Sequence, residues 1–391
     1  MSAPEPAGDG VLVGRGGFKV DRAHALDTLR RFLLPGQSGG WLLWARCAAA
    51  CGAAEAALTV GSREASLSFG GRPFTREDLL DPFAPLFSGR KAGRDRGAAL
   101  ALGLLQTFAA EPAEVALETG AGTERLRLAG PTLSELTVTE AWGTEDRTVL
   151  SARWPAFSDR MQAFMGDPEG RSAPLIHPDR LRLTGRAAAW PAEADSGRTF
   201  RLGGACGRLA PPAFYTPPDS PLRLYKLGVM VCEHREPFVW AKVQGWVNDD
   251  KMATSAGQTA AVPDARFHAL MRLVGREAEA LVVEAASGYP DLMERARDTM
   301  GLDKDAQRVW DQRMRWGPQA GAEAAVPSWW RRLLDPGSPR RFEGYRTVLE
   351  AAERTLWLKD VSSRLEAPGR TPPPALAAAV RSALAESEPR D

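Results

Sequence analysis

The 391-residue sequence contains few of the side chains from which metal sites and disulfides are built. It has four cysteines and four histidines, too few for a disulfide framework in a chain of this length. Cys47 and Cys51 have the spacing of residues on one helical face, but no second pair with metal-ligand spacing accompanies them. We therefore expect free thiols, a reducing compartment and no metal site.

The sequence also lacks an excess of charge and a long apolar run. Its 50 Lys and Arg residues nearly balance 49 Asp and Glu residues, which gives a formal net charge of +1. Such a balance provides no general attraction for nucleic acid or an anionic membrane. No apolar run reaches the roughly 18 residues of a membrane span, and residues 1–10 lack the pattern of a secretory signal. We expect a cytoplasmic protein with no nucleic-acid or membrane partner.

Common catalytic motifs are missing as well. The sequence has no G-x-S-x-G elbow, Walker A loop, G-x-G-x-x-G fingerprint or H-E-x-x-H helix. What is present is an ordinary globular composition, with 44% hydrophobic and 25% charged residues. At this length two or three domains are expected.

Residues 11–153 alternate between helical and strand patterns and predict a first domain. The pattern predicts helices at 21–34, 41–54 and 98–110, a hairpin at 56–69, a short helix capped by Thr75, and four antiparallel strands between 115 and 153. The helix at 41–54 is apolar almost all round, so we expect it to be buried. The fold class is α+β, with helices on one face of a mostly antiparallel sheet.

Residues 154–287 predict a second α+β domain, and residues 288–391 a helical extension. In the second domain we expect strands at 181–188 and 199–203, a hairpin of 222–233 and 237–247 with its turn at 234–236, and a helix at 263–287. The extension is rich in tryptophan and ends in a charged tail. Residues 1–10, rich in Pro, Gly and Ala, are expected to be a disordered tail.

The segment from Phe18 to Gly89 resembles a known family in the order of its elements. The runs "FKVDRAHALDTLRRFLLP", "GGWLLWARCAAACGAAEAALTV" and "ASLSFGGRPFTREDLLDPFAPLFSG" are similar to the opening of a GHKL (Bergerat-fold) ATPase domain. This class includes the ninety-kilodalton heat-shock chaperone, DNA gyrase, the MutL mismatch-repair proteins and the histidine kinases. "SGRKAGRDRGAALALGLL" resembles their glycine-rich lid and the helix after it. The segment from Arg223 to Val274 resembles the ribosomal-protein-like βαβ domain that follows in several of these families.

The sequence departs from this family at the positions whose side chains bind and hydrolyse ATP in the family. There, a carboxylate on the long helix activates water, an Asn holds Mg²⁺, and a loop Asp accepts the adenine amino group. Here the long helix carries Arg46 and Cys47 with alanines, Phe69 stands where the Asp is expected, and Pro73 replaces the second loop glycine. The resemblance therefore implies a fold that is kept while ATP hydrolysis, and ATP binding with it, is lost.

These departures favour a non-catalytic interaction or scaffold protein on a chaperone-like pseudo-ATPase fold, with no cofactor. In such a protein Phe69 and the long helix fill the former nucleotide pocket, and the two domains are held together instead of being gated by ATP. The alternative is a divergent ATP-binding GHKL chaperone or ATPase that uses ATP and Mg²⁺. It would need phosphate-binding glycines and carboxylates from other places, for which the candidates are Gly70, Gly71, Gly93, Gly97, Glu55, Glu77 and Asp78.

Two segments are candidates for binding a protein partner, whose identity the sequence does not give. The first is the basic cluster in the lid-like segment, made of Arg90, Lys91, Arg94 and Arg96. The second is Trp329, Trp330 and Arg331, because Trp and Arg are common interface anchors. The ordinary interpretations are a solvated loop in the first case and tryptophans that pack the extension onto the second domain in the other.

Overall fold

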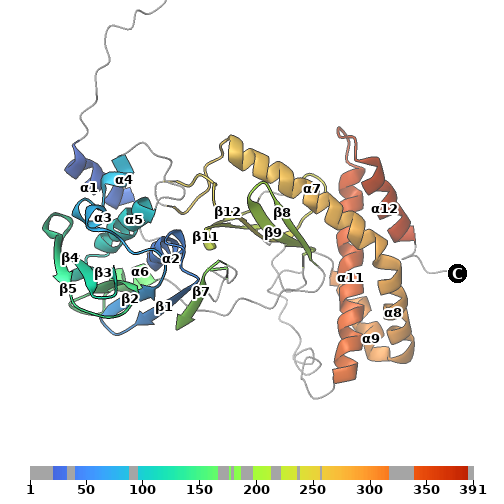
Figure 1. Cartoon of the computed structure of the whole chain (residues 1–391). Coiled ribbons are helices and arrows are strands. Elements are labelled where there is room, and N and C mark those ends of the chain that lie inside the picture. Colours follow the sequence, from blue (N-terminus) through green and yellow to red (C-terminus); the bar gives the residue numbers. More distant parts are fainter. Residues whose placement is uncertain are drawn as a thin grey trace, which may run out of the picture.

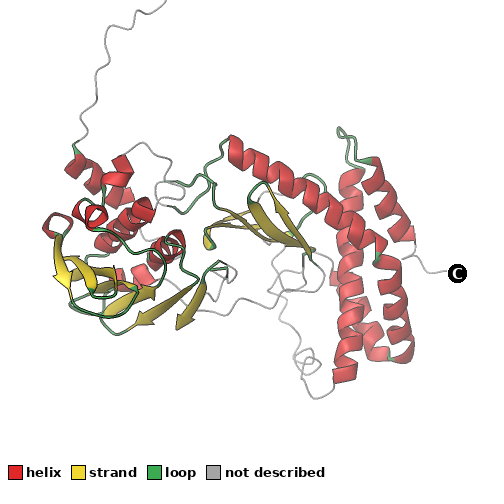
Figure 2. Ribbon diagram, in the orientation of Figure 1, coloured by secondary structure: helices red, strands yellow, loops and turns green. Residues whose placement is uncertain are grey.

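The computed structural model describes residues 21–32, 40–87, 96–165, 176–177, 180–185, 197–212, 222–235, 238–255, 258–316 and 339–385. Figures 1 and 2 show two mixed sheets, each with helices beside it, and a further group of helices at the C-terminal end. The predicted α+β class with a C-terminal helical region is therefore confirmed. Among these residues, no helix combines the length and the apolar character needed to cross a membrane.

The first sheet has seven strands in the order β5-β4-β3-β6-β2-β1-β7. Alternation places one row of each strand in the core, as in β2, where Ala65, Leu67 and Phe69 are buried. Neighbouring strands are antiparallel except for β1 and β7, which are parallel. The strands are β1 Glu55–Val60, β2 Glu64–Phe69, β3 Glu114–Ala121, β4 Glu124–Gly130, β5 Thr137–Ala141, β6 Thr148–Arg153 and β7 Arg182–Gly185.

Six helices accompany this sheet, of which α1, α2, α3 and α5 match the four that the sequence predicts for the first domain. They are α1 Arg22–Phe32, α2 Trp41–Ala50, α3 Arg76–Leu80, α4 Ala84–Phe87, α5 Arg96–Ala109 and α6 Asp159–Met165. As expected, α2 is buried along most of its length, and Trp44 donates a hydrogen bond from Nε1 to Oγ1 of Thr107 on α5 at 2.8 Å. Gly103 lets the two helices approach, because a Cβ there would lie 3.3 Å from the Trp44 ring.

Two segments beyond the expected domain boundary at residue 153 belong to the first core. The α6 side chains of Met161 and Phe164 are fully buried in it, and the Phe164 ring lies 5.0 Å from that of Trp44. Strand β7 pairs with β1 and extends the first sheet. Periodicity in the sequence predicts a strand near 181–188, but it carries no information about which sheet the strand joins.

The second sheet has five strands in the order β11-β10-β12-β9-β8. They are β8 Arg198–Leu202, β9 Ala205–Ala210, β10 Leu222–Lys226, β11 Val229–His234 and β12 Gln244–Asp249. The predicted hairpin with its turn at 234–236 is wrong, because β10 and β11 are the hairpin and β12 lies parallel to β10. The turn is formed by Leu227 and Gly228, both with positive φ, as a two-residue hairpin turn of the primed type requires.

A long helix connects the second sheet to the C-terminal helices. It is α7 Ala265–Ser287, followed by α8 Tyr289–Leu302, α9 Lys304–Trp316, α11 Pro339–Leu365 and α12 Pro374–Ala385. Asp264 caps α7 by accepting a hydrogen bond from the amide of Phe267 at 2.8 Å. One hydrophobic core runs through the second sheet, α7 and these helices. Figure 1 shows α7 passing from the second sheet to the C-terminal helices. Trp357 on α11 adds a hydrogen bond from Nε1 to the carbonyl of Lys242 at 2.7 Å, so the extension packs onto the second domain.

Candidate functional site

The candidate site lies around α2, the counterpart of the long helix in the GHKL resemblance. Arg46 and Cys47 on this helix and Cys51 at its C-cap are each no more than 5% exposed. A buried guanidinium cannot act as a general base, and thiols are poor ligands for the hard cation Mg²⁺. None of the residues Trp41–Ala50 of α2 carries a carboxylate or a carboxamide.

The loop after β2 lies directly on the C-terminal end of α2. The amide of Arg72 donates to the carbonyl of Cys51 at 2.8 Å, and Gly71 has a φ of +90°. A Cβ at Gly71 would lie 2.5 Å from the Cys51 carbonyl oxygen, so only glycine fits. Gly71 therefore has a structural role here. A Cβ at the neighbouring Gly70 would meet open space.

Aromatic rings fill the space beneath this loop. Phe69 ends β2 with 1% of its surface exposed, and Phe74 is 3% exposed. The Phe74 amide donates to Oγ1 of Thr119, whose hydroxyl is also hydrogen-bonded to that of Thr148 at 2.8 Å. Full burial of one such ring contributes about 1.5–3 kcal/mol. The position at which the family's adenine-binding Asp is expected is thus occupied by an apolar core side chain.

Arg96, at the start of α5, closes the other side of the loop. Its guanidinium lies 5.1 Å from the centre of the Phe74 ring and donates to the carbonyls of Arg72 and Pro73 and to the carboxylate of Asp78. Its side chain is 14% exposed. All these partners belong to the same chain. The other members of the expected phosphate and partner sites, Arg90, Lys91, Gly93, Arg94, Trp329, Trp330 and Arg331, lie outside the described residues. Gly97 is buried in the first turn of α5.

The three carboxylates of the alternative interpretation each have a local role. Asp78 forms a capping box with Thr75 and an ion pair with Arg96. Glu55 on β1 is paired with Arg182 on β7 at 3.1 Å, and both side chains are exposed. Glu77 is exposed, and its pKa is lowered first by a hydrogen bond from its own amide and then by the Thr75 hydroxyl.

The two thiols on α2 interact with each other. Cys47 donates a hydrogen bond to the Cys51 sulfur, which raises the pKa of Cys47 and lowers that of Cys51. The positive charge of Arg96 also lowers the pKa of Cys51. In the part of the chain that the structure describes, no three His, Cys, Asp or Glu side chains gather in a way that could hold a metal ion.

Arg46 reaches from α2 into the second domain. Its Nη1 donates to Oε1 of Gln258 at 3.0 Å and its Nη2 to the carbonyl of Met230 on β11 at 3.1 Å. Burial lowers the pKa of Arg46 to about 10. Gln258 is held in place by Thr254, whose hydroxyl donates to the same Oε1 at 2.8 Å. Sequence reasoning missed the contact of Arg46 with the second domain, for which the one signal is a cation inside an apolar helix.

Further contacts join the two domains beside Arg46. Val229 of β11 is buried in the core of the first domain and forms a bridge with Ile176. The amide of His177 donates to the carbonyl of Gly228 at 2.7 Å, and its ring lies 4.0 Å from that of Trp246. The β10–β11 turn is thereby fixed against the first domain by backbone, apolar and charged contacts together.

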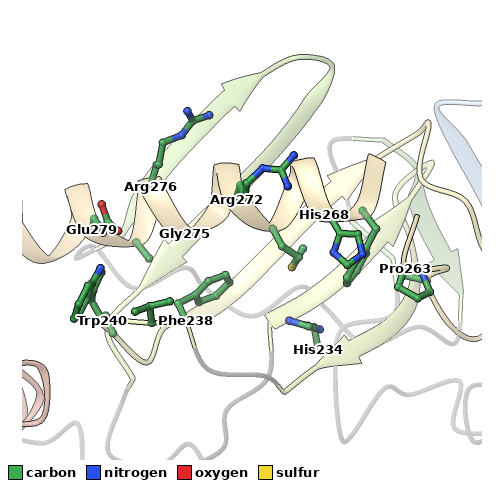
Figure 3. A pocket seen from close by; sticks show the side chains of 15 residues that line it. His234, Phe238, Trp240, Pro263, His268, Arg272, Gly275, Arg276 and Glu279 are labelled. Carbon is green, nitrogen blue, oxygen red and sulfur yellow. The ribbon is translucent and has the colours of Figure 1, made fainter. Parts of the chain in front are cut away.

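Two cavities lie away from these contacts. One of about 410 Å³ lies at the ends of β1 and β2 and is lined by residues that include Glu55, Gly70 and Arg147. The other, of about 660 Å³, lies on the second domain between α7 and residues 238–241 (Figure 3). Neither is lined by Arg46, Cys47 or Arg96.

Comparisons with known proteins do not assign the chain to a family. No protein-family model matches the chain, and no curated protein matches it. Among solved structures, the B subunit of DNA gyrase from Myxococcus xanthus is similar at 14% sequence identity and a TM-score of 0.42, over 66% of this chain and 96% of that one. We draw no argument about activity, ligand or assembly from a similarity of this size. The GHKL resemblance continues to rest on the order of the elements around α2.

Proposed function

We propose that this chain is a non-catalytic interaction or scaffold protein, built on a chaperone-like pseudo-ATPase fold. One observation carries the proposal: the buried Arg46 of α2 is hydrogen-bonded directly to Gln258 of the second domain. In several of the resembled families the corresponding loop of the second domain, residues 253–260 here, lends a Lys or Arg to the nucleotide phosphate. Here the loop reaches a side chain of the first domain instead.

The contact between Arg46 and Gln258 fixes the relative placement of the two domains without a ligand. Arg46 donates to Oε1 and the backbone carbonyl of Gln258 and to the carbonyl of Met230, and all three acceptors are neutral. Separating the domains would leave these buried groups without partners, at a cost of about 1–3 kcal/mol for each one that stays buried. The protein would then present one fixed outer surface to a partner, with no nucleotide cycle to open or close it.

A divergent ATP-binding protein is the second candidate, and one observation favours it. The cavity of about 410 Å³ brings together Glu55 and Gly70, a candidate carboxylate and a candidate phosphate-binding glycine, beside Arg147. Against it, Glu55 is already paired with Arg182. The two candidates differ in whether the purified chain takes up nucleotide.

Titration calorimetry of the full chain with Mg-ATP, and with Mg-ADP beside it, tests the proposal. We expect no binding heat and no change in melting temperature at millimolar nucleotide. Binding at micromolar concentration would contradict the pseudo-ATPase assignment. In that case a loss of binding in Glu55→Gln, with binding kept in Glu64→Gln on the neighbouring strand, would assign the nucleotide to the smaller cavity.

A further inference from the structure

The first sheet has an open edge at strand β5. This strand, Thr137–Ala141, pairs with β4 on one side in an unbroken antiparallel register. Among the described residues, no hydrogen bond outside that ladder reaches the β5 backbone. Figure 1 shows β5 at the end of the first sheet that lies away from the second domain. A row of N–H and C=O groups of β5 therefore points away from the sheet.

The strand lacks the features that usually protect a sheet edge. It contains no Lys, Arg, Pro or Gly, and Glu140 is its single charged residue. Val138 packs against the first core, so Glu140, two residues further on, lies on the helix side of the sheet. There Arg76 of α3 lies 3.7 Å from its carboxylate. The one charge of β5 is thus directed over the sheet face and leaves the edge open to another strand.

The other edge strands among the described residues are shorter, more charged or covered. Strand β7 has four residues, and β8 carries Arg198 and Arg201. Strand β11 lies against the first domain, where the Met230 carbonyl accepts from Arg46. Of these four edges, β5 is the one best suited to pair with a further strand.

An exposed tryptophan directly follows β5. Trp142 is 93% exposed, the largest value among the exposed large hydrophobic side chains of the described residues. Single exposed apolar side chains are common on protein surfaces. This ring, however, continues the line of an open edge, and a tryptophan that is covered on association buries 150–250 Å².

Two copies of β5 are complementary to each other. In an antiparallel pair with its two-fold axis at Thr139, Thr137 lies opposite Ala141 of the second copy and Val138 lies opposite Glu140. All five residues of each strand are then paired, and Thr139 meets its own counterpart, which is a favourable cross-strand pair. An axis at Glu140 would instead place two carboxylates directly opposite each other, which is unfavourable.

The same register covers the exposed tryptophan. Counting outward from the axis, Trp142 of one copy lies opposite Leu136 of the other, and this happens at both ends of the pair. Leu136 is partly buried and packs against the first core. Each tryptophan would therefore extend the apolar surface of the other copy's core.

We propose that this chain forms a symmetric dimer in which the β5 strands of two copies pair and join their first sheets. The inference goes beyond the proposed interaction role, because it names a second copy of the chain as the partner of this edge. A contact of one short strand and one tryptophan per copy is smaller than the roughly 1,600 Å² of a standard interface, so the dimer is weak, with a micromolar dissociation constant.

Sedimentation velocity of the full chain between about 1 and 200 µM tests the dimer, a range that brackets a micromolar dissociation constant. We expect a reversible monomer–dimer equilibrium. Trp142→Ser, and Thr139→Lys, which places two like charges opposite each other, should each weaken it at least about tenfold. The matched controls are Leu302→Ser, at a side chain that is 91% exposed on α8, and Thr59→Lys, at an exposed threonine on the inner strand β1. Neither control should change the equilibrium.

Disulfide cross-linking tests the register. In a chain with Cys206→Ser and Cys232→Ser, Thr139→Cys places two thiols opposite each other, with Cα atoms about 4.5–5.5 Å apart, a distance that a disulfide spans. Thr137→Cys places them about 13 Å apart along the strands, which a disulfide does not span. Under mild oxidation Thr139→Cys should form a covalent dimer and Thr137→Cys should not. An excess of unlabelled chain keeps this dimer out of distances measured between two labels on one copy.

Three results would overturn the proposal. They are a monomer at every concentration, a dimer that Trp142→Ser and Thr139→Lys leave unchanged, and cross-linking of Thr137→Cys as readily as Thr139→Cys. Unchanged circular dichroism and melting temperature show that each variant is folded. Nucleotide calorimetry decides the proposed function independently of all these outcomes.

Discussion

Nη1 of Arg46 in the first domain lies 3.0 Å from Oε1 of Gln258 in the second. Both side chains are held by their own domains, Arg46 within the buried helix α2 and Gln258 by the Thr254 hydroxyl. A hydrogen bond between two fixed groups loses little entropy when it forms. The pair is therefore suited to hold the two domains in one arrangement.

A double-mutant cycle on this pair should show strong coupling. Arg46→Ala removes the donor to Met230 as well, so we expect it to lower the free energy of unfolding by about 1–3 kcal/mol. Gln258→Ala should lower the free energy of unfolding by less than Arg46→Ala does. The coupling free energy between the two substitutions should be about 0.5–3 kcal/mol. Chemical denaturation of the full chain and the three variants measures these values. A coupling indistinguishable from zero would show that the contact does not join the domains.

The close approach of the loop to the end of α2 predicts that alanine substitutions at two neighbouring glycines have different effects on stability. Gly71→Ala places a Cβ 2.5 Å from the Cys51 carbonyl at a positive φ, so it should destabilise the protein by more than about 1 kcal/mol. Gly70→Ala, in open space, should change stability by less than about 0.5 kcal/mol. Urea unfolding of both variants makes the comparison. Equal effects at the two positions would refute the close approach of the loop to α2.

Arg96 should be a stabilising residue of the first domain. Arg96→Ala leaves the Pro73 carbonyl and Asp78 without their donor, and we expect a loss of about 1–3 kcal/mol in the free energy of unfolding. Arg96→Lys should lower the free energy of unfolding by less than Arg96→Ala does. A lysine keeps the positive charge but lacks the planar guanidinium, which donates to several acceptors at once. The control is Arg76→Ala, whose side chain is 51% exposed and pairs with Glu140 at 3.7 Å; it should cost less than about 1 kcal/mol. If Arg96→Ala behaves like Arg76→Ala, the guanidinium is free to meet a partner instead.

Glu279 gives the protein a defined dependence on pH. Burial raises the pKa of Glu279 above its ordinary value of 4.5, so its favourable contribution is fully present below pH 4.5 and is lost as the pH rises through the higher folded-state pKa. Glu279→Gln carries no such charge. Its free energy of unfolding should therefore exceed that of the unchanged chain at pH 7 and converge with it near pH 4. Thermal unfolding across this range measures the difference, and a gap that widens toward low pH would have the wrong sign.

The local elements of the first domain are largely predictable from the sequence. Thr75 is an N-cap as its sequence context predicts, and the apolar helix containing Trp44 is buried. These features depend on neighbours a few residues away, which periodicity and capping signals report.

What the sequence does not reveal depends on contacts between distant segments or on unusual backbone conformations. Leu227 adopts a positive φ in a tight turn, a conformation that its side chain does not signal. The pairing of β7 with β1 and the bond from Arg46 to Gln258 join segments that are more than a hundred residues apart. Only the three-dimensional arrangement brings their side chains together.

The spacing of the two domains with and without nucleotide tests the central claim most directly. Spin labels at Glu124→Cys and Glu294→Cys, two exposed positions on separate domains, can be placed after Cys206 and Cys232 are changed to Ser, because Cys47 and Cys51 are buried. Double electron–electron resonance then gives the distance between the labels. The account predicts one narrow distance distribution that millimolar Mg-ATP leaves unchanged and that Arg46→Ala broadens. A distance that shifts when Mg-ATP is added would contradict a nucleotide-independent arrangement of the domains.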